Sequence, residues 1–253
     1  METEIVTLNE SEEEAAPALA QKPAVAENRL RRWLEVGLVL LVAFGDFYLN
    51  YSNVFGGFVN AFARGRGFSS ANIWWTIMLL REIPGLLVLG FVLRRRKLRI
   101  RDLGLRWSIR DLSTGGLVAA ISYAACELGY FVFSAMQRLL FGTMAHRPSE
   151  LALFGHTTVM MAVFSLVNPF FEELIVRAYL MTEVKALTGS WTLAAVLSTA
   201  VQTSYHLYYG WTMALALGCQ FLVFSIYYAR FRKATPVMFA HGVFDWIGVF
   251  QLM

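Results

Sequence analysis

Residues 154–187, FGHTTVMMAVFSLVNPFFEELIVRAYLMTEVKAL, form an apolar block that two adjacent glutamates and one arginine interrupt. About 20 apolar residues are enough to span the hydrocarbon core of a bilayer, and this block is longer. An ionisable side chain costs roughly 2.5–3.5 kcal/mol at the centre of a bilayer. Glu172, Glu173 and Arg177 therefore indicate a membrane helix that carries a polar structural or functional centre.

The composition of the 253-residue chain is that of a membrane protein. Hydrophobic residues make up 57% and charged residues 16%, and the mean hydropathy is +0.51. Soluble domains carry ~45–50% apolar and ~25% charged residues, so this chain has too few charges for a surface in contact with water. The composition also excludes disorder, a collagen helix, a coiled coil and a disulfide scaffold, and both cysteines lie inside apolar blocks.

The apolar residues are gathered in seven blocks, each long enough to cross a bilayer. They cover residues 33–60, 72–93, 112–135, 154–187, 191–208, 212–229 and 235–252. We therefore predict an all-α fold, a polytopic membrane helical bundle with about seven transmembrane helices. Gly115 and Gly116 favour a start for the third helix a few residues later than its apolar block.

Lysine and arginine in the short loops predict the orientation, because cytosolic loops carry an excess of both. With seven spans, fifteen basic residues fall on one side: Arg29, Arg31, Arg32, Arg94, Arg95, Arg96, Lys97, Arg99, Arg101, Arg106, Arg110, Lys185, Arg230, Arg232 and Lys233. Four fall on the other: Arg64, Arg66, Arg138 and Arg147. We therefore predict a cytosolic N-terminus, in the plasma membrane of a bacterium or, in a eukaryote, in the endoplasmic reticulum. The net charge of +4 follows from this topology, and no nucleic-acid partner is expected.

The chain divides into three regions. Residues 1–28 hold seven glutamates and no aromatic residue, which predicts a disordered acidic tail. Residues 29–111 hold the N-terminal transmembrane helices and a basic cytosolic loop, and residues 112–253 hold the remaining helices. The basic cluster from Arg94 to Arg110 is typical of a stop-transfer signal, and binding of anionic lipid is the alternative.

The densest group of ionisable residues lies in the fourth span. Glu173 and Arg177 are four residues apart with the acid first, which favours an ion pair on one helical face. Glu172 is expected to point about 100° away and to have no local partner. An unpaired carboxylate in such a site is a plausible general base, whereas a structural ion network is the alternative role for all three residues. Pro169 is expected to bend the helix.

Histidines in two later spans complete a candidate site. His206 lies at the polar end of the fifth span, and His241 and Asp245 lie four apart in the seventh, where the carboxylate can orient the imidazole. We interpret His146 and His156 as interfacial. Other ionisable residues within the spans are Glu35, Asp46, Arg81, Glu82 and Glu127.

These three motifs make residues 112–250 resemble the CPBP intramembrane endopeptidases, which include the type II CAAX prenyl proteases and the Abi-type proteins. The resemblance rests on Glu172-Glu173-x-x-x-Arg177, on His206 in the place of the family's Phe-x-x-x-His, and on His241-Gly-Val-Phe-Asp245. It implies that residues 112–253 form a catalytic membrane domain that hydrolyses peptide bonds. The sequence departs from the family pattern at Gln202, where Phe is usual, and at Asp245, which is often Asn.

The resemblance implies a role for each motif. Glu172 and His206 would hold a water, and Glu172 would remove its proton. His241, supported by Asp245, would stabilise the oxyanion, and Glu173 with Arg177 would fix the helix. One carboxylate and two histidines are also a zinc ligand set, Glu172, His206 and His241. We favour the metal-free alternative, with no cofactor, because Glu172 is then free to act as the base.

Two other functions stay open at this point. One is a transporter in which Asp46, Arg81, Glu127 and the acids of the fourth span line a proton or ion path, and the other is a catalytically silent scaffold or immunity protein. Depth counting places Glu172 and His206 at matched heights, ~24–25 Å along their helices, but His241 only ~8 Å from the start of its own. The expected partners are the bilayer and a peptide or protein substrate, which is prenylated if the CAAX resemblance extends to the substrate. The sequence does not specify the oligomeric state.

Overall fold

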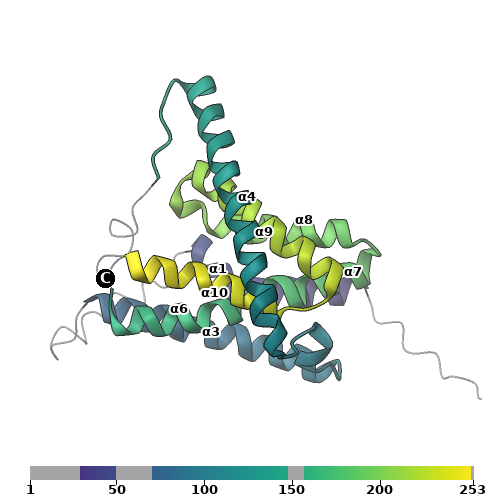
Figure 1. Ribbon diagram of the computed structural model, residues 1–253. Coiled ribbons are helices and arrows are strands. Elements are labelled where there is room, and N and C mark those ends of the chain that lie inside the picture. The colour runs from purple at the N-terminus through teal and green to yellow at the C-terminus, as the bar shows by residue number, and fades with distance from the viewer. Residues whose placement is uncertain (1–28, 50–69, 148–156, 252–253) are drawn as a thin grey trace, which may run out of the picture.

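The computed structural model describes residues 29–49, 70–147 and 157–251, and all regular elements within these ranges are helical. The predicted tail, the end of the first span and His156 lie outside the described residues. The elements are α1 (Arg29–Leu49), α3 (Ser70–Arg95), η1 (Ile100–Leu103), α4 (Ile109–Phe141), α6 (Val159–Glu172), η2 (Glu173–Tyr179), α7 (Leu180–Thr188), α8 (Trp191–Tyr205), η3 (Leu207–Tyr209), α9 (Trp211–Phe231) and α10 (Thr235–Gln251) (Figure 1).

The distribution of side chains in the bundle is that of a membrane protein, with apolar residues on the outside and charged residues at the centre. Four helical stretches are long and apolar enough to cross a bilayer: Ala71–Arg95, Ile109–Phe141, Val159–Thr188 and Trp211–Phe231. Large apolar side chains face outward, with Leu139 84% and Phe131 72% exposed, while Glu173 and Arg177 are fully buried. This arrangement suits a hydrocarbon surrounding and confirms the predicted all-α membrane bundle.

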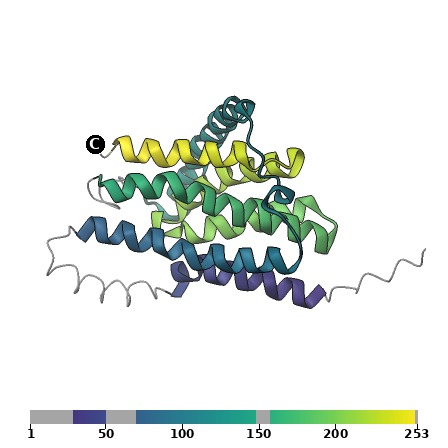
Figure 2. The same cartoon turned by 90° about the horizontal axis from the view of Figure 1, so that it is seen from below.

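The described helices form a closed ring. In ring order, α1 packs on α3, α3 on α6, α6 on α10, α10 on α4, α4 on α9, and α9 on α8, while α7 and α8 contact α1. Both views show α3, α6 and α10 side by side, with α4 crossing them steeply (Figures 1 and 2). The segment η2 contacts α8, α9 and η1, and each of its residues is buried, so it forms the centre of the bundle.

Helix α4 begins earlier than Gly115 and Gly116 suggested. It starts at Ile109, where Ser108 caps it by accepting from the backbone N–H of Arg110. Gly115 instead allows close packing on α10, because an added Cβ would meet Phe239 at 2.7 Å. The two glycines therefore lie inside the helix, where the first of them permits a close approach.

Basic residues gather at one end of the ring, as the loop charges predicted. Arg32 from α1 and Arg96 after α3 both form ion pairs with Glu183, a buried residue of α7. At the same end, Arg232 after α9 donates to Thr182 at 3.2 Å. The N-terminus of α1 and the C-termini of α3, α7 and α9 therefore share one side of the bundle.

The continuous helical stretch Val159–Thr188 changes its winding at the acidic pair. From Glu173 to Tyr179 the backbone is a π-helix, with i→i+5 hydrogen bonds, between the α-helical segments α6 and α7. Pro169 lies inside α6, four residues before this change. A π segment inside an α-helix is uncommon and is frequent at functional sites.

Candidate active site

The two glutamates converge on one nitrogen rather than pointing apart. Nε2 of Gln202 on α8 lies 3.0 Å from Oε2 of Glu172 and 3.1 Å from Oε1 of Glu173. An α-helix would separate adjacent side chains by about 100°. Here Glu172 ends α6 and Glu173 begins the π segment, and both are buried, at 5% and 0% exposure. Both carboxylates therefore face the centre of the bundle.

Gln202 is the hub of the site. Its side chain is fully buried. Its Oε1 accepts from Nη2 of Arg177, and its Nε2 donates to the two carboxylates. Carboxylates accept and guanidinium groups donate, so the amide has one orientation that satisfies all three groups. The sequence pointed to Gln202 only as a departure from the family pattern. Its position four residues before His206, in an otherwise apolar span, was the available signal.

Arg177 balances the charge of the acidic pair from a fully buried position. Its Nε lies 3.5 Å from Oε2 of Glu173, which confirms the predicted i, i+4 ion pair. Its Nη1 donates to Ser198 Oγ at 2.9 Å, and its Nη2 donates to the carbonyl oxygen of Phe221 at 3.2 Å. A buried ion pair is favourable only when such additional hydrogen bonds satisfy its remaining groups. Arg177 thus ties the π segment to α8 and α9.

Glu172 has no partner within its own span, as expected, but it is not an unpaired carboxylate. Tyr205 on α8 donates from its hydroxyl to Oε2 of Glu172 at 2.7 Å, and Gln202 donates to the same oxygen. Both donors are neutral and come from another helix, which is why sequence spacing within the fourth span could not show them. Because both bonds go to Oε2, Oε1 is left to receive a water.

His206 follows α8 and is oriented by its own backbone. Its Nδ1 lies 2.8 Å from the carbonyl oxygen of Gln202, so this nitrogen carries the proton and Nε2 of the neutral ring is an acceptor. The ring lies against Tyr205 and Phe221, with centroid distances of 4.8 and 4.9 Å. His206 and His241 are both close enough to Glu172 to interact with it electrostatically.

His241 lies between two carboxylates. Its Nδ1 donates to Oε1 of Glu173 at 2.9 Å, and its Nε2 lies 3.5 Å from Oδ1 of Asp245. The first contact joins α10 to the π segment and gives Glu173 a second role beside its ion pair with Arg177. The second confirms that His241 and Asp245 share a face of α10. The longer distance makes Nε2 the less tightly held of the two ring nitrogens.

The sequence predicts that His241 lies at a different depth from Glu172 and His206. The extension of α7 beyond the start of α10 explains most of this difference. Helix α10 runs antiparallel to α6, with Thr157 bonded to the carbonyl oxygen of Val249 at one end and His241 bonded to Glu173 at the other. The start of α10 thus lies beside the end of η2, and α7, nine residues long, extends past it by about 14 Å. This length accounts for most of the ~16 Å difference expected from the sequence.

Other ionisable residues in the spans lie in separate pairs. Arg81 lies 3.5 Å from Asp46 between α1 and α3, and Arg147 makes two hydrogen bonds to Glu127, at 3.0 and 3.1 Å. The side chains of Arg147 and Glu127 are exposed, so this pair does not extend a buried polar path through the described part of the bundle. His146 is exposed, close to the end of α4.

Glu82 on α3 is a further acidic residue near the site. It is 2% exposed and interacts electrostatically with Glu172 and Asp245. Neither of its carboxylate oxygens has a hydrogen-bond partner among the described residues. The sequence showed Glu82 only as one of several ionisable residues in the spans, because its neighbours come from other helices.

The alternative zinc site fits the geometry poorly. Within residues 29–49, 70–147 and 157–251, no three His, Cys, Asp or Glu side chains are placed to hold one metal ion. Of the three candidate ligands, His241 has both ring nitrogens directed at carboxylates, so one of these contacts would have to break for it to bind zinc.

The fold and the site define a polytopic helical membrane protein with a buried centre of glutamates, one arginine and two histidines. Residues 154–247 match the family model described as type II CAAX prenyl endopeptidase Rce1-like, and this range includes all three motifs. This part of the chain is thus similar to the Rce1-like family, in agreement with the resemblance predicted from the motifs. No curated protein and no solved structure matches the chain.

Proposed function

We propose that this protein is an intramembrane endopeptidase in which Glu172 activates a water for hydrolysis of a peptide bond. The observation that carries the proposal is the geometry of Glu172, whose Oε2 is fixed by Tyr205 and Gln202 while Oε1 stays available. The match of residues 154–247 to an endopeptidase family model supports the reaction class.

The water lies between two acceptors in this proposal. It donates one hydrogen to Oε1 of Glu172 and the other to Nε2 of His206, which directs a lone pair at the scissile carbonyl carbon. Glu172 takes the first proton as the new C–O bond forms. When the tetrahedral intermediate collapses, the C–N bond breaks and Glu172 returns this proton to the leaving amine.

His241 stabilises the negative charge that develops on the carbonyl oxygen. It donates from Nε2 to the oxyanion while Nδ1 stays bonded to Glu173, and a ring that donates from both nitrogens is an imidazolium. Asp245, 3.5 Å from Nε2, holds the ring in place and balances its charge. Asp245 therefore acts through His241 and does not itself contact the oxyanion, for which an ionised carboxylate has no donor.

The proposed mechanism uses no metal ion or other cofactor. Glu172 would be lost as a base if it coordinated zinc, and the contacts of His241 with Glu173 and Asp245 support a role in hydrogen bonding. These contacts favour the glutamate mechanism, and a comparison of activity with and without a chelator tests it.

The proposed topology places the basic end of the bundle in the cytosol. On this assignment the chain crosses the membrane seven times, with α1, α8 and α10 as spans in addition to the four most apolar stretches. The excess of arginine and lysine at that end supports a cytosolic N-terminus, and we place the protein in a bacterial plasma membrane. The proposed substrate is a membrane-associated peptide with a prenylated Cys-a-a-X end.

The test is cleavage of a quenched prenylated Cys-a-a-X peptide, and of a small panel of leader peptides, by the purified full chain in detergent. Glu172→Gln and His241→Ala are compared with wild type, with and without a strong chelator. Glu127→Gln is the matched control, since Glu127 is a carboxylate of a membrane helix that pairs with Arg147 and lies outside the site. We expect both site variants to lose at least 100-fold in kcat/KM and the control to retain full activity.

The chelator and the substrate panel separate the alternatives. Activity that survives the chelator supports the glutamate mechanism, whereas loss that zinc restores assigns Glu172, His206 and His241 to a metal site. Cleavage that needs no prenyl group rejects the proposed substrate class but keeps the reaction. If folded wild-type protein cleaves no peptide in the panel, the proposal fails in favour of a silent scaffold.

A further inference from the structure

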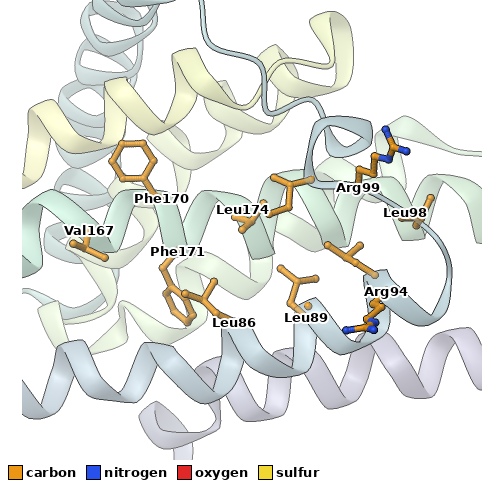
Figure 3. A pocket seen from close by; sticks show the side chains of 12 residues that line it. Leu86, Leu89, Arg94, Leu98, Arg99, Val167, Phe170, Phe171 and Leu174 are labelled. Atoms are coloured by element: carbon orange, nitrogen blue, oxygen red, sulfur yellow. The ribbon is translucent and has the colours of Figure 1, made fainter.

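A groove runs between α3 and α6 on the side of the bundle next to the acidic pair. Its volume is about 670 Å³. It is lined by Leu86, Leu89, Gly90, Leu93, Arg94, Leu98, Arg99, Ile100, Val167, Phe170, Phe171 and Leu174. Ten of these twelve residues are apolar or glycine, and the two arginines lie at the same end of the groove, on opposite sides of it (Figure 3). The groove is therefore apolar along most of its length and positively charged at one end.

The two arginines of the groove differ from their neighbours in the chain. Arg95 forms an ion pair with Glu35, and Arg96 forms one with Glu183. Arg94 and Arg99 are exposed, and neither makes an ion pair with any residue that the structure describes. Their charges are therefore available to an anion at the basic end of the bundle.

We propose that this groove binds one anionic phospholipid, with an acyl chain between α3 and α6 and the phosphate between Arg94 and Arg99. Basic pockets between membrane helices are suited to anionic head groups, and arginine binds phosphate through two parallel hydrogen bonds. The nine residues from Leu86 to Arg94, separated by eight helical steps, extend the groove about 12 Å along α3 from its cationic end. Lipid binding in this groove does not require proteolysis, so this proposal is independent of the proposed function.

The floor of the groove shows that it has room for a chain. A Cβ built on Gly90 meets nothing within 4 Å, so α3 leaves open space where a side chain would otherwise lie. Figure 3 shows Phe170 and Phe171 turned to opposite sides of α6, with Phe171 beside Leu86. A bound acyl chain would thus contact apolar side chains of both helices along its length.

The groove shares a wall with the candidate active site. The ring of Phe171 lies 5.7 Å from that of Phe44, which stacks at 4.6 Å on Tyr205. Tyr205 in turn donates to Glu172. A lipid in the groove would therefore pack against Phe171. Through Phe44, Phe171 supports Tyr205, which donates the hydrogen bond to Glu172.

The test measures lipid retention on the full chain in detergent. The protein is titrated with phosphatidylglycerol or phosphatidylcholine, and bound lipid is counted by native mass spectrometry. The double variant Arg94→Gln/Arg99→Gln removes the cationic end, and Arg101→Gln/Arg106→Gln is its control, with two exposed arginines of the same segment that do not line the groove. Gly90→Phe fills the groove, and Gly116→Phe is its control, since Gly116 also has open space and lies elsewhere.

We expect one phosphatidylglycerol to bind at least tenfold more tightly than phosphatidylcholine. Both groove variants should lose at least tenfold in affinity for phosphatidylglycerol, and both controls should retain it. Equal binding of the two lipids would overturn the proposal. An equal loss in Arg101→Gln/Arg106→Gln would reduce the effect to general attraction by the basic loop, and undiminished binding to Gly90→Phe would place the lipid outside the groove.

Discussion

Gln202 donates to Glu172 across two helices at 3.0 Å, so an amide of α8 positions the carboxylate that ends α6. The same amide nitrogen bonds to Glu173, and the amide oxygen accepts from Arg177. One neutral side chain thereby contacts a buried cation and two buried anions at once. Together with Tyr205 and Ser198, it fixes the relative position of α6, η2 and α8 at the site.

Gln202→Leu should be among the most destabilising substitutions in the chain. It leaves Glu172, Glu173 and Arg177 each short of a partner, and an unsatisfied buried group costs about 1–3 kcal/mol. We expect a loss of at least ~3 kcal/mol of unfolding free energy, measured by thermal or denaturant unfolding in detergent. Thr199→Val on the same helix removes one hydrogen bond, to Ser225, and should cost less than half as much. Equal effects of the two variants would contradict the role of Gln202 as a hub.

Arg177→Met should destabilise the protein by about 3–5 kcal/mol, because it leaves buried carboxylates without their cation. Adding Glu173→Gln should recover part of this loss, since an amide keeps an acceptor for His241 and removes the uncompensated charge. Unfolding of both single variants and of the double variant forms a cycle that isolates the coupling. Strictly additive losses would show that the 3.5 Å ion pair contributes no coupling.

Tyr205→Phe should reduce catalysis and leave the fold intact. The ring keeps its stacking on Phe44 at 4.6 Å and on Phe47 at 5.2 Å, and only the hydrogen bond to Glu172 is lost. A hydrogen bond to a charged group contributes about 1.5–3 kcal/mol, so we expect kcat to fall by about tenfold or more, with KM unchanged. Steady-state kinetics on a cleaved peptide gives both constants. A change confined to KM would indicate that the tyrosine contacts substrate instead.

Glu82→Met should raise the stability of the protein. Both carboxylate oxygens of Glu82 are buried without a hydrogen-bond partner in the described part of the chain, which costs about 1–3 kcal/mol. A side chain of similar length without polar oxygens removes this cost, so the unfolding temperature should rise. Glu82→Gln, which keeps a polar group in the same place, should give little or no gain. A lower unfolding temperature for Glu82→Met would mean that the carboxylate has a stabilising partner.

The positions of the helices were largely predictable because hydrophobicity and length determine membrane spans. The blocks at 72–93, 212–229 and 235–252 match α3, α9 and α10 closely. The pairing of Glu173 with Arg177 was also predictable, because both lie on one segment and their spacing suffices.

Features that depend on contacts between helices could not be predicted in the same way. The hub role of Gln202 and the donor Tyr205 arise only when α8 packs on the π segment. The π segment itself has no compositional signal, and it is what turns Glu172 and Glu173 toward the same amide. The hydrogen bonds of Glu172 could not be predicted because both donors lie on α8, outside the fourth span.

The lengths of the helices bear on how the protein is assembled in the membrane. Helix α8, which precedes His206, and helix α10, which carries His241, have 15 and 17 residues and are not among the four stretches that are long and apolar enough to cross alone. We expect their insertion to be assisted by contacts with neighbouring helices, with α9 lying between them in the chain. Assembly of the site would then be cooperative, because each histidine lies on or directly after one of these two short helices.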